Sequence, residues 1–321
     1  MGRLRRGICM RLFDMHCDTL YECSIGGYSL SENELQLDLT RGLAYNSWAQ
    51  VFAVWMPDTL RGNAAWIQCR SILELAQKET ILNPKFRIIY NEADLDFAIQ
   101  NNVCAAVLAV EGGSALAGNL ETLGLLASMG VKIITLTWNG SNELGHGCES
   151  LCNDGLTEFG KKAIKAMEKL NIIPDVSHLN QAGFWDVMEN TNNPIIASHS
   201  VSAAICDHPR NLTDDQFKAI MKRGGVVGLN LCESHLGEQS FECLQKHLEH
   251  YLSLGGEHTV AFGCDFDGTD LPPEWGGIEV MEKIYEYFQR KNYEESLLDR
   301  LFFGNCYDFF HSALTSTASM V

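Results

Sequence analysis

The chain has 321 residues, enough for one large domain or two modest ones, and 46% hydrophobic with 20% charged residues is ordinary for a globular enzyme. Its formal net charge of −17 argues against nucleic acid or an anionic membrane as the main partner, because binding a polyanion needs a basic surface.

The amino-terminal stretch MGRLRRGICMRLF begins with basic residues, as a signal peptide does. Arg11 interrupts the short apolar run that follows, no small-residue cleavage site comes after it, and no apolar run reaches membrane-spanning length. Twelve cysteines are scattered without a C-x-x-C pair, whereas disulfide frameworks are typical of small secreted chains. We therefore expect reduced thiols, no membrane contact and a cytoplasmic location.

Strand-like and helix-like patterns alternate along the chain. Eight apolar runs predict strands at residues 12–18, 50–56, 104–111, 132–138, 172–178, 194–200, 226–231 and 259–265. Amphipathic patterns predict helices at residues 64–82, 120–130, 157–171, 211–225, 279–290 and 294–311. Gly130 is a predicted helix stop, and Thr157 is a predicted amino-terminal cap.

Apolar strands that alternate with amphipathic helices indicate an α/β fold with a parallel sheet covered by helices. Eight such units in this length predict a (β/α)₈ barrel, with residues 1–321 forming a single catalytic domain with terminal helices. The alternative is a doubly wound open sheet. No glycine-rich phosphate loop follows the first strand, which disfavours that alternative.

Ionisable side chains follow five of the predicted strands. In a barrel the carboxyl ends of all strands meet at one edge, where the chemistry takes place. The residues at these positions are His16 and Asp18, Glu111, His178, His199 and Asp265. Charge at the end of a buried strand is costly unless it is paired or bound to metal.

Imidazole and carboxylate groups suit zinc or a similar divalent ion. Three histidines and two carboxylates among them exceed what one tetrahedral catalytic ion takes, so they suggest two metals that share Glu111. Each residue alone also has a structural explanation: a hydrogen-bonded strand end, a helix cap or a turn. Their convergence from five strands favours the metal site. Cys17, between two ligands, is expected to face away from the site in an extended strand.

Arg210, in CDHPRNLTDD, follows the sixth predicted strand. It could form a surface ion pair with Asp214 or Asp215. On the catalytic face of an acidic protein, it could instead grip a substrate carboxylate.

These residues lie in segments that resemble one family. DMHCDT, AVLAVEGG, PDVSH, PIIASHS, CDHPRNLTDDQ, GCDFDGTD and FGNCYDFF occur in that order over residues 14 to about 310. On these motifs the chain resembles the membrane dipeptidase (renal dipeptidase) family of binuclear zinc peptidases, as a bacterial-type cytoplasmic member.

The resemblance implies a (β/α)₈ barrel with two zinc ions per chain. It implies that His16 and Asp18 bind one ion and His178 and His199 the other, with Glu111 bridging the two. It places Arg210 in substrate binding and Asp265 in proton transfer, and family analogy suggests a homodimer.

One position departs from the family pattern. Many members have histidine after the "LT" of the fourth strand, in contact with the substrate carbonyl, whereas TLTWNG places Trp138 there. Indole donates one N–H and cannot carry a positive charge. Asn139 or the zinc ions could compensate, so Trp138 and Asn139 are candidate substrate-binding residues.

The resulting hypothesis is hydrolysis of a dipeptide by a metal-bridging hydroxide, with Asp265 as general base and then acid. Another binuclear amidohydrolase, cleaving a lactam, an N-acyl amino acid or a phosphoester, is the alternative, because such barrels host many reactions. A non-catalytic metal-binding protein is a further alternative. It is disfavoured because the acid/base group is present.

Overall fold

The computed structural model describes residues 8–315, so the basic start of the amino terminus, where a signal peptide was considered, lies outside the described residues. The strands are β1 (Ile8–Cys17), β2 (Tyr45–Trp55), β3 (Phe86–Ile88), β4 (Cys104–Glu111), β5 (Val131–Thr135), β6 (Ile173–Asp175), β7 (Val227–Leu229) and β8 (Val260–Phe262).

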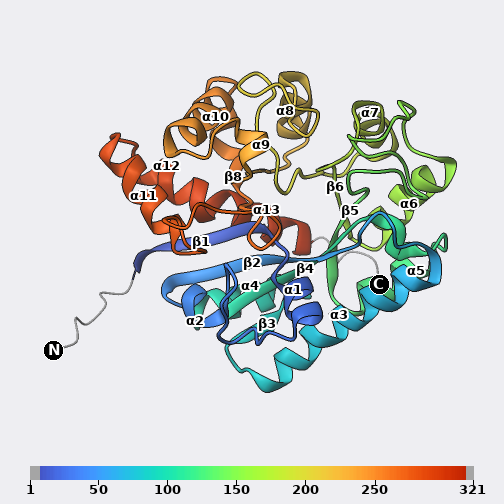
Figure 1. Ribbon diagram of the computed structural model, residues 1–321, viewed down its shortest axis with the longest axis horizontal. Coiled ribbons are helices and arrows are strands. Elements are labelled where there is room, and N and C mark those ends of the chain that lie inside the picture. Colours follow the sequence, from blue (N-terminus) through green and yellow to red (C-terminus); the bar gives the residue numbers. More distant parts are fainter. Residues whose placement is uncertain (1–7, 316–321) are drawn as a thin grey trace.

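The helices surround these strands (Figure 1). They are α1 (Thr19–Gly26), α2 (Leu39–Gly42), α3 (Gly62–Leu82), α4 (Glu92–Gln100), α5 (Glu121–Ser128), α6 (Glu158–Lys169), α7 (Gln181–Asn190), α8 (Asp214–Lys222), α9 (Glu233–Leu236), α10 (Phe241–Ser253), α11 (Val280–Arg290), α12 (Glu295–Asp299) and α13 (Asn305–Thr315). None of the described helices has the length and apolar character needed to cross a membrane.

The strand pairs in the described residues are parallel, and they run in the order β6-β5-β4-β2-β1-β8-β7, with β3 beside the start of β4. Residues 194–200 close the ring between β6 and β7. Ile196 bridges to Asp175 on one side, and Ala197 bridges to Val227 on the other. The predicted (β/α)₈ barrel is confirmed.

The strands differ from the prediction at two places. Residues 194–200 complete the ring through isolated bridges and do not form an extended strand. β3, which the sequence analysis did not predict, is only three residues long and pairs with Cys104–Ala106 of β4.

The later strands end sooner than predicted. β6 ends at Asp175 and β8 at Phe262, so His178 and Asp265 lie three residues beyond their strands. Both residues have left-handed backbone conformations, with φ of 67° and 64°. A strand cannot continue through such a residue, and the turn that it makes directs the side chain over the barrel.

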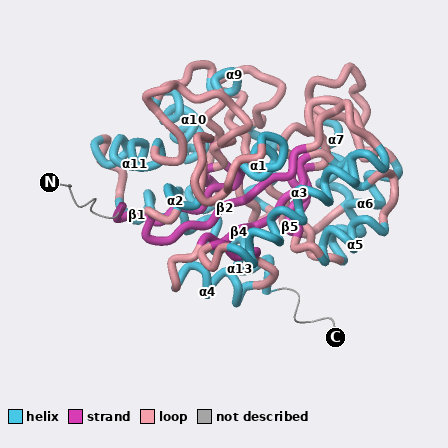
Figure 2. The backbone as a smooth tube through the Cα atoms, turned by 60° about the horizontal axis from the view of Figure 1, so that its bottom comes forward, coloured by secondary structure: helices cyan, strands magenta, loops and turns pink. Residues whose placement is uncertain are grey.

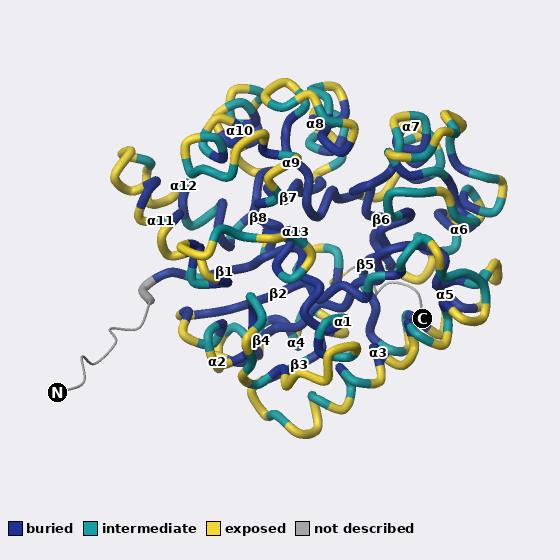
Figure 3. The backbone as a smooth tube through the Cα atoms, viewed as in Figure 1, coloured by how far each residue is buried: buried dark blue, intermediate teal, exposed yellow. Residues whose placement is uncertain are grey.

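Alternate residues of each strand face two different cores. In β4, Ala105, Val107 and Ala109 pack in the barrel interior, whereas Leu108 and Val110 pack against the surrounding helices. Figure 3 shows the strands as buried and the outer turns of the helices as exposed. Glu111 continues the inward-facing series and therefore reaches the carboxyl end of the barrel interior.

The amino-terminal end of the barrel is filled by apolar side chains. Phe310 of α13 stacks on Phe13 of β1, with 5.1 Å between the ring centroids. α4 contacts α13, and Figure 2 shows the two side by side on one edge of the molecule. Because this end is packed shut, the open end of the barrel is the one that carries the polar side chains.

The helix ends follow the sequence signals. Thr157 accepts a hydrogen bond from the Gly160 N–H, and Thr213 forms a capping box with Gln216. Gly130, with φ of 96°, follows α5 as a helix stop. The single helix predicted at 294–311 is instead α12, a π-helical turn at Arg300–Gly304 and α13.

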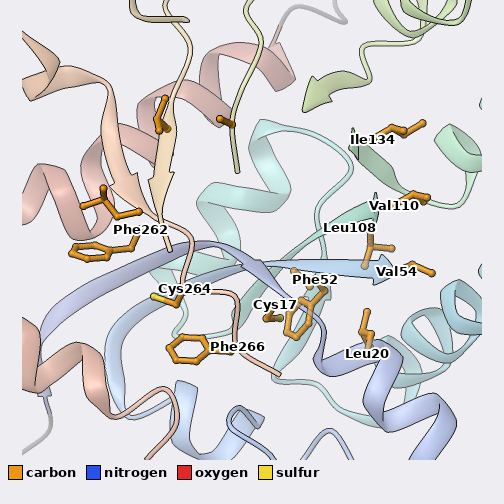
Figure 4. Close-up of a cluster of buried hydrophobic side chains, with 14 of the residues drawn as sticks. Cys17, Leu20, Phe52, Val54, Leu108, Val110, Ile134, Phe262, Cys264 and Phe266 are labelled. Atoms are coloured by element: carbon orange, nitrogen blue, oxygen red, sulfur yellow. The ribbon is translucent and has the colours of Figure 1, made fainter. Parts of the chain in front are cut away.

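The cysteines of the described side chains are all free thiols. Cys17 is buried between the sheet and the helices, in the cluster that contains Leu20, Phe52 and Phe266 (Figure 4). Burial raises the pKa of the Cys17 thiol well above its usual range, so the residue is an inert part of the core. Its predicted orientation, away from the polar end of the barrel, is confirmed.

Candidate metal centre and active site

The five predicted metal ligands meet at the carboxyl end of the barrel, and all are buried. On one side, His16 Nε2 lies 3.4 Å from Glu111 Oε2 and 3.6 Å from Asp18 Oδ2. On the other side, Glu111 Oε1 lies 2.9 Å from His178 Nε2 and 3.5 Å from His199 Nε2. One oxygen of Glu111 thus faces His16 and the other faces His178 and His199.

A strand irregularity helps to orient His16. Phe13 and Met15 pack in the barrel interior, so strict alternation would turn His16 outward. The register between β1 and β2 shifts between Asp14 and Cys17, and such a shift re-aims side chains. The Asp14 carboxylate accepts hydrogen bonds from the His16 N–H at 3.1 Å and the Cys264 N–H at 2.8 Å, which tie β1 to the loop after β8.

Hydrogen bonds fix the tautomer of two of the histidines. Asp175 Oδ2 accepts from Ser198 Oγ at 2.6 Å, so Ser198 Oγ in turn accepts from His199 Nδ1 at 2.7 Å. His178 Nδ1 lies 2.6 Å from Asn139 Oδ1, an acceptor, so Nδ1 carries the proton there too. Nε2 of both rings therefore presents a lone pair to the centre of the site.

This arrangement fits a cation. His178 Nε2 and His199 Nε2 are 2.9 Å apart, and neither can donate to the other or to Glu111. His16 Nε2 and Asp18 Oδ1 are buried without a hydrogen-bond partner among the described residues. Lone pairs that converge in a buried space repel one another unless a positive ion lies between them. The donor set of imidazoles and carboxylates is the one that zinc prefers.

The charges in the site are strongly coupled. Burial raises the pKa of Asp18 to about 7 and that of Asp265 to about 6, and the Glu111 charge adds to both shifts. Burial lowers the pKa of His178 to about 4 and that of His199 well below its usual value, so both rings are neutral at pH 7. Neutral imidazole is the form that binds a metal.

In Glu111 and His16, unlike the other residues of the site, neighbouring charges outweigh the effect of burial on the pKa. Burial alone would raise the pKa of Glu111, but the positive charge of His16 outweighs it and the net shift is downward. Burial alone would lower the pKa of His16, but Glu111 and Asp18 outweigh it and the net shift is upward. Glu111 is therefore ionised at neutral pH, which is the form of a carboxylate that binds a metal.

Replacing Ser198 tests the hydrogen bond that orients the His199 ring. In Ser198→Ala, His199 Nδ1 and Asp175 Oδ2 lose their partner, so we expect zinc affinity to fall about 10–100-fold. The free energy of unfolding should fall by about 1–3 kcal/mol, because buried polar groups are left unpaired. Competition with a zinc-binding dye and urea unfolding measure the two effects. Ser253→Ala, on the exposed face of α10, is the control; equal zinc affinity in both variants would refute this role.

The ligands open into a cavity of about 410 Å³. Trp138 and Asn139 both line it, together with Asp265. Trp138 meets Trp55 edge-on at 5.0 Å, and Trp55 meets Tyr21 edge-on at 4.9 Å, so three aromatic rings form one wall. The cavity can hold a small molecule against an aromatic surface and a cluster of metal ligands.

Arg210 is buried beside the ligands. Its Nη1 donates to Ser200 Oγ at 3.0 Å and its Nη2 to the His199 carbonyl at 3.1 Å, while Nε has no partner. The alternative of a surface ion pair is wrong, because Arg210 is buried with these partners, and Asp214 accepts instead from His250 Nε2 at 2.7 Å. Arg210 is not among the residues that line the cavity, which on this side presents His208 and His235.

Sequence reasoning missed the residues that support the ligands. Asp175 precedes His178 by three residues and Ser198 directly precedes His199, so proximity to a ligand was the available signal. His208 and His235 carried no signal, because each is a single histidine outside the strand ends.

A second cavity, of about 460 Å³, lies at the opposite end of the barrel. Ile173 at the start of β6, Val226 before β7 and Phe309 of α13 line it. The groups of side chains that could hold a metal ion in the described part of the chain lie instead at the carboxyl end of the barrel. The chemistry therefore belongs to the smaller cavity.

Comparisons with known proteins agree with this geometry. A protein-family model described as membrane dipeptidase (peptidase family M19) matches residues 8–319. An uncharacterized protein of the pqqA 5′ region of Klebsiella pneumoniae is 32% identical over 234 residues, which are 69% of this chain and 86% of that protein.

Two solved structures are similar over nearly the whole chain. The dipeptidase AC, a metallopeptidase of family M19, has a TM-score of 0.88 at 25% identity, over 95% of this chain and 99% of its own. A metallopeptidase from Rhodobacter sphaeroides, bound to a phosphinate mimic of the dipeptide L-Ala-D-Ala, has a TM-score of 0.86 at 24% identity, over 94% and 99%. The chain belongs to the membrane dipeptidase family, peptidase family M19, and is a metallo-dipeptidase.

Proposed function

We propose that the enzyme hydrolyses dipeptides with two zinc ions per chain. His16 and Asp18 bind the first ion, His178 and His199 bind the second, and Glu111 bridges them. The observation that carries this assignment is that the two carboxylate oxygens of Glu111 face different residues. Oε2 faces His16, whereas Oε1 faces His178 and His199.

When bound, the two ions supply a water of lowered pKa and polarise a carbonyl. Asp265 moves the proton. Its carboxylate lines the cavity, with Oδ1 3.8 Å from His16 Nε2. Burial, assisted by the Glu111 charge, raises its pKa to about 6. A carboxylate with a pKa close to neutral both accepts and returns a proton efficiently, so Asp265 acts as general base and then as general acid.

The remaining site residues orient the substrate and the ligands. Arg210 supplies positive charge for the substrate carboxylate. Trp138 replaces a histidine of the family and offers an apolar face with one N–H donor. Asn139 accepts from His178 Nδ1 at 2.6 Å, so its main part is to orient this ligand, and oxyanion stabilisation falls to the metal ions.

A panel of substrates tests the activity. Metal-replete protein is offered L,L and L,D dipeptides, with an N-acyl amino acid, a lactam and a phosphodiester as controls. We expect cleavage of dipeptides alone, loss of activity with a chelator and recovery with zinc. Failure to cleave any dipeptide would refute the proposal, and turnover of a control substrate would favour another binuclear hydrolase.

Three further properties are part of the proposal. The chain acts as one catalytic domain, because its active-site cavity is lined from Asp18 to Gly268. A cytoplasmic location is supported by the free thiols of the described residues, because disulfides are typical of oxidising compartments. Family analogy suggests a homodimer, which light scattering of the purified protein can test.

A further inference from the structure

Two histidines form a wall of the active-site cavity that the mechanism above does not use. His208 lies in the loop after residues 194–200 and His235 lies in α9, and both line the cavity. Their ring centroids are 4.9 Å apart. Two segments distant in sequence thus bring a pair of imidazoles to one place.

The protonated nitrogen of His235 can be assigned. Asn230 Nδ2 lies 3.1 Å from the His199 carbonyl oxygen and 2.9 Å from His235 Nδ1. The contact with a carbonyl requires the amide nitrogen at that position, so this nitrogen also donates to His235 Nδ1. Nδ1 is therefore an acceptor, and in the neutral ring Nε2 carries the proton.

The same reasoning holds for His208. Its Nδ1 lies 3.2 Å from the Arg210 backbone nitrogen, which can only donate. The proton of the neutral ring is again on Nε2. The hydrogen bonds of the described residues leave Nε2 of His208 and Nε2 of His235 without a protein partner, so both N–H groups are available to a ligand.

The charge near this wall favours an anion. Arg210 is buried, its Nε has no partner, and no carboxylate of the described residues lies within ion-pair distance. An unpaired buried cation is costly until an anion compensates it. Burial, followed by the Arg210 charge, lowers the pKa of His235 to about 2 and also lowers that of His208. Both rings therefore remain neutral donors at physiological pH.

The rest of the cavity has the opposite character. Glu22, Asp18 and Asp267 line it elsewhere, and Glu149, which also lines the cavity, opposes the lowering of the His208 pKa without outweighing it. A dipeptide carries a carboxylate at one end and an ammonium group at the other. Each end is therefore complementary in charge to a different region of the cavity. Its carboxylate is complementary to the wall formed by His208 and His235, which offers two N–H donors and lies near the positive charge of Arg210.

We propose that His208 and His235 donate their Nε2–H groups to the carboxy-terminal carboxylate of the substrate, with Arg210 supplying the compensating charge. The inference rests on the proposed dipeptidase function. It assigns the direct contacts to two neutral histidines, and it makes them the residues that distinguish a free carboxylate from an amide.

Equilibrium binding tests this inference. The probes are a phosphinate analogue of alanyl-alanine with a free carboxylate and the same analogue with a terminal carboxamide, each titrated into zinc-loaded protein by calorimetry. We expect the wild type to bind the acid at least about tenfold more tightly than the amide, because hydrogen bonds to a charged group are strong. His235→Phe should remove most of this preference by weakening acid binding alone.

Matched variants separate a binding role from a structural one. His208→Phe should act like His235→Phe, whereas His235→Gln, which keeps an N–H donor, should retain part of the preference. His311→Phe, on the exposed side of α13, should leave both affinities unchanged. Zinc content shows that each variant keeps its metal centre.

The outcomes distinguish the two proposals. An acid preference that survives in the His208→Phe/His235→Phe double variant would overturn the inference, as would equal or undetectable binding of the two probes by the wild type. If the acid preference depends on these histidines but no dipeptide is cleaved, the carboxylate contact stands and the proposed hydrolytic function fails.

Discussion

Replacing Glu111 by alanine is expected to remove both metal ions and to lower kcat/KM for a dipeptide by about a thousandfold or more. The residue presents one oxygen to His16 and the other to His178 and His199, so neither group of ligands is complete without it. The ions supply several kcal/mol of transition-state stabilisation, and each 1.4 kcal/mol is a factor of ten in rate.

The number of metal ions bound per chain in three variants tests this assignment. His16→Ala should retain one ion per chain, because only one group of ligands is broken. Cys17→Ser should retain two, because its side chain lies in the core on the other side of the strand. Metal analysis after dialysis gives the three values. Two ions in Glu111→Ala, or a loss of metal in Cys17→Ser, would contradict the bridging assignment.

Replacing Asp265 by asparagine is expected to leave the metal content unchanged and to lower kcat by about a hundredfold to ten-thousandfold, the range for loss of a general acid–base group. Asparagine is close in size to aspartate and tolerates the left-handed conformation that residue 265 adopts, with φ of 64°. The substitution therefore removes the proton-carrying oxygen with little effect on the backbone.

The control for this variant is Asp215→Asn, on the exposed first turn of α8. Steady-state kinetics and metal analysis are performed on both proteins. Near-full activity of Asp265→Asn with metal bound would show that another group moves the proton. A loss of one ion would instead make Asp265 a ligand, a role that its place near His16 and Asp18 also permits.

Much of the site was predictable because it follows from topology. In a parallel barrel the carboxyl ends of the strands meet at one edge, whatever their exact lengths. His16 and Glu111 end or nearly end their strands as predicted. His178 and Asp265 lie beyond theirs in left-handed turns, but they still reach the same edge. An error of three residues in a strand boundary did not displace a predicted ligand from the site.

Features that depend on contacts between distant segments were not predictable. Residues 194–200 complete the barrel without an extended strand. They can do so partly because glycines on neighbouring segments let the backbones approach closely. A side chain at Gly228 or Gly263 would come within 2.0 Å or 1.8 Å of the Ser198 carbonyl oxygen. The close approach of these segments therefore requires glycine at both positions, and the sequence of 194–200 itself does not reveal this.

The sequence by itself determined the alternation of strands and helices, and with it the barrel and the identity of the residues at its carboxyl edge. These depend on hydrophobic periodicity, which is a local property. Only the tertiary structure decided which nitrogen carries the proton in the histidines His178, His199 and His235. Ser198 and Asp175 set it in His199, Asn139 in His178, and Asn230 in His235. The tautomer depends on the hydrogen-bond partner on the far side of each ring, and tertiary packing brings most of those partners from other segments of the chain.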